Sequence, residues 1–248
     1  MHRSAPRLTR ILACAAVPAL LVVTGCSSDD SGGGSAGSGG GKAAESSAAA
    51  SAAPSKPAAP KPTVAPAKYA KLPDACKAVT VKTLEELIPE LKQKGGVPGK
   101  TSDLASRGSC SWNALEDKGT KGSNYRWLDV SLLRFDSEQT LGSGEERAQQ
   151  KYMEKVAEVK ATEGATDIRT SPAAGVGNES TAISYALKKT GETFRYAVIV
   201  ARTENALITV SYNGTGYAGA EPPAAADMME GTVKAVKETV KAVADANK

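Results

Sequence analysis

Hydrophobic residues recur with a clear period only in the last 180 residues of the chain, from Tyr69 to Lys248. Apolar side chains repeat at helical spacing over 81–91, over Glu145–Lys160 and from about Pro222 to the C-terminus. Five further segments alternate apolar and polar residues or form short apolar runs, a pattern that predicts strands. These segments are Ser109–Ala114, Tyr125–Phe135, Thr181–Lys188, Phe194–Arg202 and Ala206–Tyr212.

Turn and cap residues mark the ends of these elements. Thr80 can cap the first helix, and Pro89 should end or kink it because proline removes a backbone donor. Polar residues from Glu116 to Asn124 predict a long loop between the first two strands, and Thr190-Gly191 and Glu204-Asn205 predict hairpin turns between the last three. The order helix, two strands, helix, three strands, helix is typical of α+β folds. We therefore expect an antiparallel sheet of about five strands with helices packed on one face.

The N-terminus carries a pattern typical of export. Three arginines and no acid precede an apolar stretch from Ile11 to Val23, which is too short to span a bilayer as a helix of about 20 residues. Val23-Thr24-Gly25-Cys26, an aliphatic residue and two small residues before cysteine, resembles the bacterial lipobox. Cys14 fits less well, because only three apolar residues precede it.

The lipobox resemblance implies that residues 1–25 are a lipoprotein signal peptide and that Cys26 becomes a lipidated first residue. The protein would then be held by this lipid on the outer face of the cytoplasmic membrane, with the membrane as its first partner. The alternative is a soluble secreted protein in which Cys26 is incidental. Residues 26–68 are Gly/Ser-rich and then Ala/Pro-rich, with almost no large apolar side chain, so we expect a disordered linker before a single globular α+β domain at 69–248.

The net charge of +4 does not indicate nucleic-acid binding. Tyr69 to Lys248 carries 24 Lys and Arg against 24 Asp and Glu, so the excess of bases lies in the signal peptide and the linker. A neutral domain has no overall basic field for phosphate backbones. We expect no nucleic-acid partner.

Cys76 and Cys110 are the cysteines that remain once Cys26 carries lipid and the signal peptide is removed. An oxidising compartment favours a disulfide between them. The bridge would close a loop of about 35 residues and stabilise the fold by roughly 4 kcal/mol on the chain-entropy model. Two free thiols or a metal pair would need partners that this chain does not supply.

The single histidine, His2, lies in the expected signal peptide. A mature chain without imidazole excludes Ser-His-Asp and Cys-His catalysis and the commonest zinc sites. Adjacent acids such as Glu85-Glu86 and Glu145-Glu146 do not face one another on a helix. Gly95 to Thr101 resembles a phosphate-binding loop, but Lys94 stands where the first glycine is required. We therefore expect that the protein is not an enzyme and that it binds no cofactor and no metal ion.

Aromatic residues leave one question open. Trp127, Tyr152, Tyr196 and Tyr212 could line a ligand pocket, but aromatic side chains at such periodic positions more often belong to the core. We therefore expect them to be core residues.

Short motifs in the domain resemble envelope lipoproteins of actinobacteria that carry a small domain of unknown function. The motifs are the lipobox, Leu72-Pro73-Asp74-Ala75-Cys76, Cys110-Ser111-Trp112 and Gly175-Val176-Gly177-Asn178-Glu179. The chain lacks the second cysteine pair expected late in such domains. This type of lipoprotein domain also resembles non-catalytic extracellular sensor domains of bacterial kinases.

The expected lipid anchor, the long linker and the lack of catalytic side chains favour a non-enzymatic binding or sensing module outside the cytoplasm, which could contact another envelope protein. The alternative is a carrier of a lipid or another apolar ligand, and a hydrolase with a lysine or carboxylate site comes third. An apolar cavity of at least about 300 Å³ would favour the carrier, and a packed core would favour surface recognition.

Overall fold

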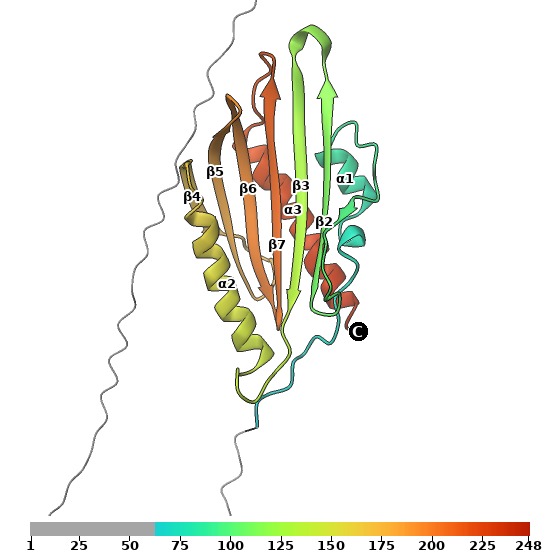
Figure 1. The fold of residues 1–248 in the computed structure, drawn as a ribbon, viewed down its shortest axis with the longest axis vertical. Coiled ribbons are helices and arrows are strands. Elements are labelled where there is room, and N and C mark those ends of the chain that lie inside the picture. Colours follow the sequence, from blue (N-terminus) through green and yellow to red (C-terminus); the bar gives the residue numbers. More distant parts are fainter. Residues whose placement is uncertain (1–62) are drawn as a thin grey trace, which may run out of the picture. The chain divides into compact units, whose positions relative to one another are not determined.

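A seven-stranded antiparallel sheet forms the centre of the molecule (Figure 1). The computed structural model describes residues 63–248, so the expected signal peptide, Cys26 and the linker up to residue 62 lie outside the described residues. The strands follow the order β1-β2-β3-β7-β6-β5-β4 across the sheet. The α+β class predicted from the sequence is confirmed.

The five predicted strands are all present and are longer than predicted, and two edge strands join them. The strands are β1 (Val97–Pro98), β2 (Arg107–Asp117), β3 (Ser123–Arg134), β4 (Ala165–Pro172), β5 (Glu179–Lys189), β6 (Glu192–Thr203) and β7 (Ala206–Tyr217). β4 was missed because seven of its eight residues are exposed, so it has no alternating apolar pattern. Its Pro172 is compatible with an edge strand, which needs fewer backbone donors than a central one.

In the described part of the chain, three α-helices complete the fold, with short 3-10 helices at Ala75–Lys77 and Gly119–Lys121. α1 (Val81–Leu87) begins after the Thr80 cap and stops before Pro89, as predicted. α2 (Gly144–Lys160) begins with a capping box, in which Ser143 and Glu146 bond to each other's backbone N–H. α3 spans Ala225–Asp245. Within residues 63–248, no helix combines the length and the apolar character needed to cross a membrane.

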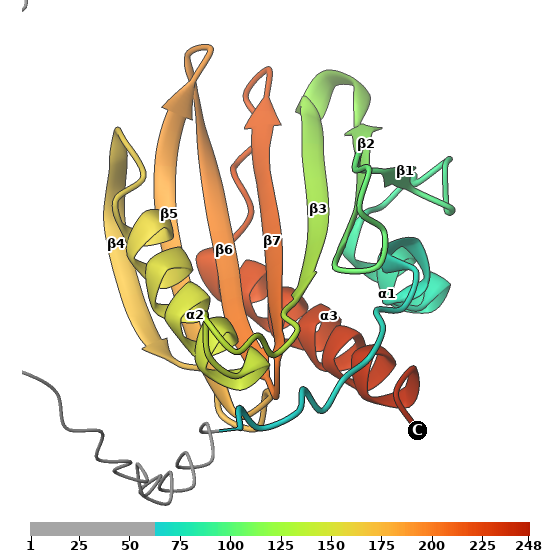
Figure 2. The same cartoon turned by 60° about the horizontal axis from the view of Figure 1, so that its bottom comes forward.

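The helices cover both faces of the sheet, which corrects the prediction that they pack on one face (Figures 1 and 2). α1 and α3 pack on one face, called here the α3 face, toward which Ala197 and Ile199 of β6 point. α2 packs on the opposite face, the α2 face, against Val198 and Val200. The uninterrupted apolar run 197–201 is typical of a strand buried on both sides, whereas helices on one face would require strict alternation.

The two faces carry cores of different size. The larger core lies between the sheet and α1 and α3 and contains fully buried side chains such as Trp112, Leu128, Ile199 and Ile208. The smaller core lies under α2 and consists of Val159, Ile183, Val198, Val200 and Leu207. Each fully buried large apolar side chain contributes roughly 1.5–3 kcal/mol relative to exposure.

Cys76 and Cys110 are joined by a disulfide, with 5.1 Å between their Cα atoms. The bridge links the first 3-10 helix to β2, and the buried Trp112 lies beside it and donates from Nε1 to Lys94 O (3.1 Å). Gly96 passes over this cluster with a positive φ of 69°, and a Cβ there would lie 2.5 Å from Cys110 Sγ. Only glycine fits both the conformation and the space.

The N-terminal segment is fixed at one end of the sheet. The Tyr69 N–H donates to Asn205 Oδ1 (2.7 Å), and Asn205 Nδ2 donates to Tyr69 O (2.9 Å) and to Phe135 O (2.8 Å). Asn205 belongs to the β6–β7 turn and is 1% exposed. The chain therefore enters the domain at the end where β6 finishes and β7 begins.

Candidate functional site

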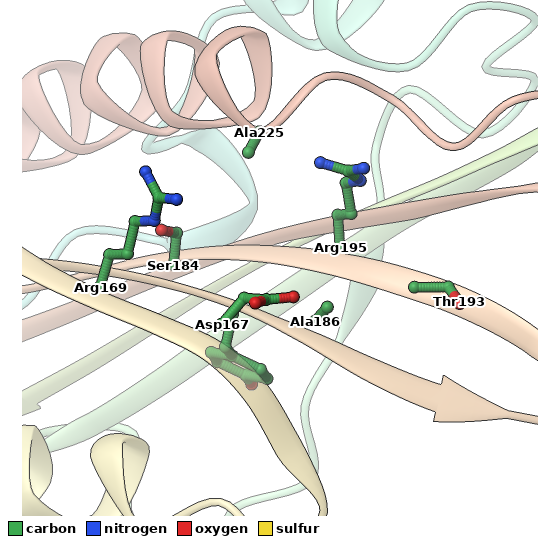
Figure 3. Close-up of a pocket in the computed structure, with 8 residues that line it drawn as sticks. Asp167, Arg169, Ser184, Ala186, Thr193, Arg195 and Ala225 are labelled. Carbon is green, nitrogen blue, oxygen red and sulfur yellow. The ribbon is translucent and has the colours of Figure 1, made fainter.

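A cavity of about 490 Å³ lies on the α3 face, where β4, β5 and β6 meet the start of α3 (Figure 3). Charged and hydroxyl side chains and small alanines dominate its lining. We call it the arginine pocket, and its lining residues are Asp167, Arg169, Ser184, Tyr185, Ala186, Thr193, Arg195 and Ala225.

An irregularity in β4 places its charged residues in the pocket. The register between β4 and β5 shifts between Thr166 and Arg169, and Asp167 has a positive φ of 53°. Such a bulge inserts extra residues into one strand and redirects their side chains. Asp167 and Arg169 therefore both line the pocket, although their strand lies at the edge of the sheet.

Arg195 approaches the pocket from β6. Its odd-numbered neighbours Ala197 and Ile199 point to the α3 face, and Arg195 follows the same alternation. Its Nε is buried and has no hydrogen-bond partner among residues 63–248. A buried donor without a partner costs roughly 1–3 kcal/mol, so a bound acceptor at this atom would recover that free energy.

The pocket arginines, Arg169 exposed and Arg195 partly buried, differ from the buried Arg134 and Arg202 in having no acidic partner within residues 63–248. Arg134 pairs with Asp136, and Arg202 pairs with Glu179 (2.7 Å) and Glu145 (3.1 Å). Within the described part of the chain, neither Arg169 nor Arg195 lies within 4.0 Å of a carboxylate oxygen. Figure 3 shows both side chains extending to the same side, toward Ala225.

The first turn of α3 adds backbone donors near this opening. Ala224, at the N-cap position, offers no side-chain hydrogen bond to the helix. The first backbone bond into the helix is the one that Met228 N–H donates to Ala224 O (3.1 Å). The N–H groups of the first turn carry the positive end of the helix dipole. The acid of this turn, Asp227, is not among the lining residues.

The pocket is therefore equipped to bind an anion. Two guanidinium groups present fork-shaped donors, which match carboxylate and phosphate oxygens. Ser184 and Thr193 add hydroxyl groups, and Asp167 supplies one opposing charge at the exposed side. Within residues 63–248, no group of three or more His, Cys, Asp or Glu side chains is placed to hold a metal ion.

Sequence reasoning missed this pocket. Its residues come from the consecutive strands β4, β5 and β6 and from the later helix α3, and β4 itself was not predicted. One signal was present: an arginine inside the apolar β6 run 194–201 requires a reason.

The four aromatic residues that could belong to a pocket or to the core differ in burial and contacts. Tyr212 is 5% exposed, and its hydroxyl donates to Leu87 O, so it is a core residue as predicted. Tyr152 packs beside the smaller core, and its hydroxyl lies 2.7 Å from Thr181 Oγ1. Trp127 is 40% exposed, so its assignment to the core was wrong. Tyr196 is partly exposed on the same face as Trp127.

The 175–179 motif has a structural role. Asn178 Oδ1 accepts a hydrogen bond from Glu204 N–H (2.6 Å), and Glu179 Oε1 accepts from Arg202 Nη2 (2.7 Å). Gly177 adopts a positive φ of 61° next to the Arg202 carbonyl, where a Cβ would clash. These contacts fix the turn before β5 against the end of β6.

A search among curated proteins finds no match. Among solved structures, LpqN of Mycobacterium tuberculosis, described as involved in cell envelope biogenesis, is 14% identical, with a TM-score of 0.27. That match covers 58% of this chain and 82% of LpqN, and at this TM-score nothing about LpqN is transferred to this chain. The profile of a family of unknown function, DUF3558, matches residues 21–187, about two thirds of the chain. The chain therefore belongs to the DUF3558 family of proteins of unknown function.

Proposed function

We propose that this protein is a lipid-anchored, non-enzymatic binding module outside the cytoplasm, which holds a small ligand by an anionic group in the arginine pocket. The observation that carries the proposal is the pair Arg169 and Arg195, both without an acidic partner in the described structure, at a cavity of about 490 Å³. The buried Arg202, in contrast, is paired with two acids.

The position of the pocket suits a tethered receptor. Tyr69 enters the domain beside Asn205, at one end of β6, whereas Thr193 of the pocket lies at the other end of β6. Ten residues separate Thr193 from Thr203, which is roughly 30 Å at about 3.3 Å per residue. A lipid on Cys26 would thus be joined to the end of the sheet remote from the pocket.

The apolar carrier receives less support than a receptor for a polar ligand. Two further cavities, of about 320 and 340 Å³, are lined mainly by charged and hydroxyl side chains, as the arginine pocket is. In the pocket, neither Ser184 nor Thr193 makes a side-chain hydrogen bond to a base within residues 63–248, so no activated nucleophile supports a hydrolase.

Arg195 Nε–H provides a direct test of binding. The mature protein, in detergent micelles, is titrated with inorganic phosphate, phenyl phosphate and benzoate while the arginine Nε–H resonances are recorded by NMR. We expect the Arg195 resonance to shift with saturation by at least one of these anions, because its free N–H gains an acceptor. Charge-assisted hydrogen bonds are worth roughly 1.5–3 kcal/mol, so Arg169→Ala should weaken binding about 10- to 100-fold.

Arg107→Ala is the matched control, because Arg107 lies at the opposite end of the sheet in a different cavity. It should leave anion binding unchanged. An Arg195 resonance that none of the anions moves, or equal affinity in Arg169→Ala and wild type, would refute the anion pocket.

Membrane attachment is tested separately. Cys26→Ser should move the protein from the membrane fraction to the soluble fraction. Retention of this variant in the membrane would refute the lipid anchor without affecting the result for the pocket.

A further inference from the structure

Within the described residues no helix covers half of the α2 face, and this half carries a row of aromatic and amide side chains. α2 packs against the parts of β5, β6 and β7 nearest the β6–β7 turn, and Figures 1 and 2 show no helix over β2 and β3 on this face. Directly paired residues cross five strands in the order Tyr185, Tyr196, Asn213, Trp127, Asn113. We call this set the aromatic row.

The row has the exposure of a binding surface. Trp127 is 40% exposed in the middle of a sheet whose other tryptophan, Trp112, is 1% exposed. The rings of Tyr185 and Tyr196 stack on each other, with centroids 4.7 Å apart and an interplanar angle of 4°. Stacking fixes both rings and so lowers the entropy that a ligand must overcome when it packs against them.

The side chain of Asn213 is independent evidence that the row is a binding surface. It lies between Tyr196 and Trp127, is 8% exposed, and makes no side-chain hydrogen bond to any of residues 63–248. Its amide atoms still reach the surface, because within residues 63–248 the buried side-chain polar atom without a partner is Arg195 Nε and not an atom of Asn213. The amide is therefore free to exchange hydrogen bonds with a ligand that lies on the row.

A cavity of about 340 Å³ adjoins the row, between the sheet and the C-terminal turns of α2. Asp129, Ser131, Thr209 and Ser211 contribute carboxylate and hydroxyl groups from β3 and β7. Asp129 makes no hydrogen bond or ion pair within the described structure, and burial raises the pKa of its carboxyl group. Tyr185 belongs to both the row and the cavity lining, so the two form one continuous surface.

We propose that the aromatic row and this cavity form a binding site for a neutral saccharide. The C–H groups on one face of a sugar ring are attracted to the negative π-face of an aromatic ring, while its hydroxyl groups exchange hydrogen bonds with amides, hydroxyls and carboxylates. The row supplies rings and amides in alternation, and the cavity supplies the remaining polar groups. A purely apolar ligand would leave Asn213 and Asp129 unpaired.

An organic cation fits this surface less well, although aromatic rings and a carboxylate could attract one. Lys189 Nζ already lies 5.2 Å from the centroid of the Tyr196 ring and donates to its hydroxyl (2.8 Å). Lys155 also lines the cavity. These two ammonium groups would repel a second cation from the same positions.

Trp127 fluorescence reports on the site, because Trp112, the other tryptophan, is buried. The mature protein is titrated with neutral hexasaccharides of glucose, mannose or galactose and, in parallel, with tetramethylammonium. We expect at least one hexasaccharide to shift the emission with saturation, and tetramethylammonium to leave it unchanged. Calorimetry supplies an affinity for variants without this reporter.

The variants separate a binding role from a structural one. Trp127→Ala and Asn213→Ala should each weaken saccharide binding at least 10-fold, whereas Leu104→Ala, which removes a side chain that is 76% exposed elsewhere, should not. Trp127→Phe keeps an aromatic ring and should retain part of the saccharide affinity. If the alanine variants unfold, the affinity of Trp127→Phe tests whether the Trp127 ring contacts the saccharide. Arg195→Ala should leave saccharide binding intact, so failure of the arginine pocket is distinguishable from failure of this site.

The proposal is overturned if no hexasaccharide produces a fluorescence change or a heat of binding in the wild type. It is also overturned if Trp127→Phe and a folded Asn213→Ala both bind with wild-type affinity, or if tetramethylammonium binds in place of the sugars.

Discussion

Replacing Cys76 and Cys110 together by alanine should lower the free energy of unfolding by about 4 kcal/mol. The two cysteines are 34 residues apart in sequence, and the chain-entropy cost of closing such a loop gives this value. Alanine is preferable to serine, because position 110 is 1% exposed and a serine hydroxyl there would add the cost of an unpaired polar group. For a domain of this size, the expected fall in Tm is roughly 8–16 °C.

Urea denaturation followed by circular dichroism measures the effect. The m-value should rise slightly, because the disulfide restricts the unfolded chain and its removal lets that chain expose more surface. Wild type under reducing conditions should behave like the double variant. Lys77→Ala, an exposed change next to Cys76, should alter stability by less than about 0.5 kcal/mol. A loss below about 1 kcal/mol in the double variant, or a reduced wild type as stable as the oxidised one, would refute the chain-entropy argument.

Two further predictions concern polar groups that only the structure identifies. Asn205→Ala should destabilise the domain by about 3 kcal/mol, because it leaves Tyr69 N–H, Tyr69 O and Phe135 O without their partner. Urea denaturation measures this loss of stability, and hydrogen exchange at the Tyr69 amide should become faster. A loss below about 1 kcal/mol would contradict this role of Asn205. Folding raises the pKa of Asp129 above the ordinary value of 3.8, mainly through burial, with Lys155 opposing the shift, so the native state binds this proton more tightly than the unfolded chain does. The stability of wild type relative to Asp129→Asn should therefore rise as pH falls from neutral toward about 4. Urea denaturation of both proteins at each pH measures this difference. A difference that does not change with pH would show that the carboxyl group is freely solvated.

The sequence predicted local elements well wherever one short-range rule decided them. Thr80 caps α1, and Pro89 ends it, because capping and the missing proline donor act within one turn of helix. The prediction failed at β4, whose exposed residues carry no pattern and which pairs only because β5 offers a free edge. It also failed for Trp127, since periodicity shows which side of a strand a residue occupies and not whether a helix covers that side.

Both candidate sites depend on such tertiary information. Arg195 was visible as a charge inside an apolar strand, but its meaning came from Arg169 on an unpredicted strand and from the start of α3. Asn213 gave no sequence signal, because an amide is notable only once the structure shows that its side chain has no hydrogen-bond partner within residues 63–248 and lies between two aromatic rings.

By itself, the sequence determined the α+β class, the five inner strands, the three helices and the pairing of Cys76 with Cys110, because hydrophobic period, caps and cysteine count act locally or by exclusion. Only the tertiary structure decided that helices cover both faces of the sheet, that β4 and β6 bring two arginines together, and that no helix of residues 63–248 covers half of the α2 face. These features arise from pairing and packing between segments far apart in the chain, and no local pattern of residues encodes which surfaces such packing leaves uncovered.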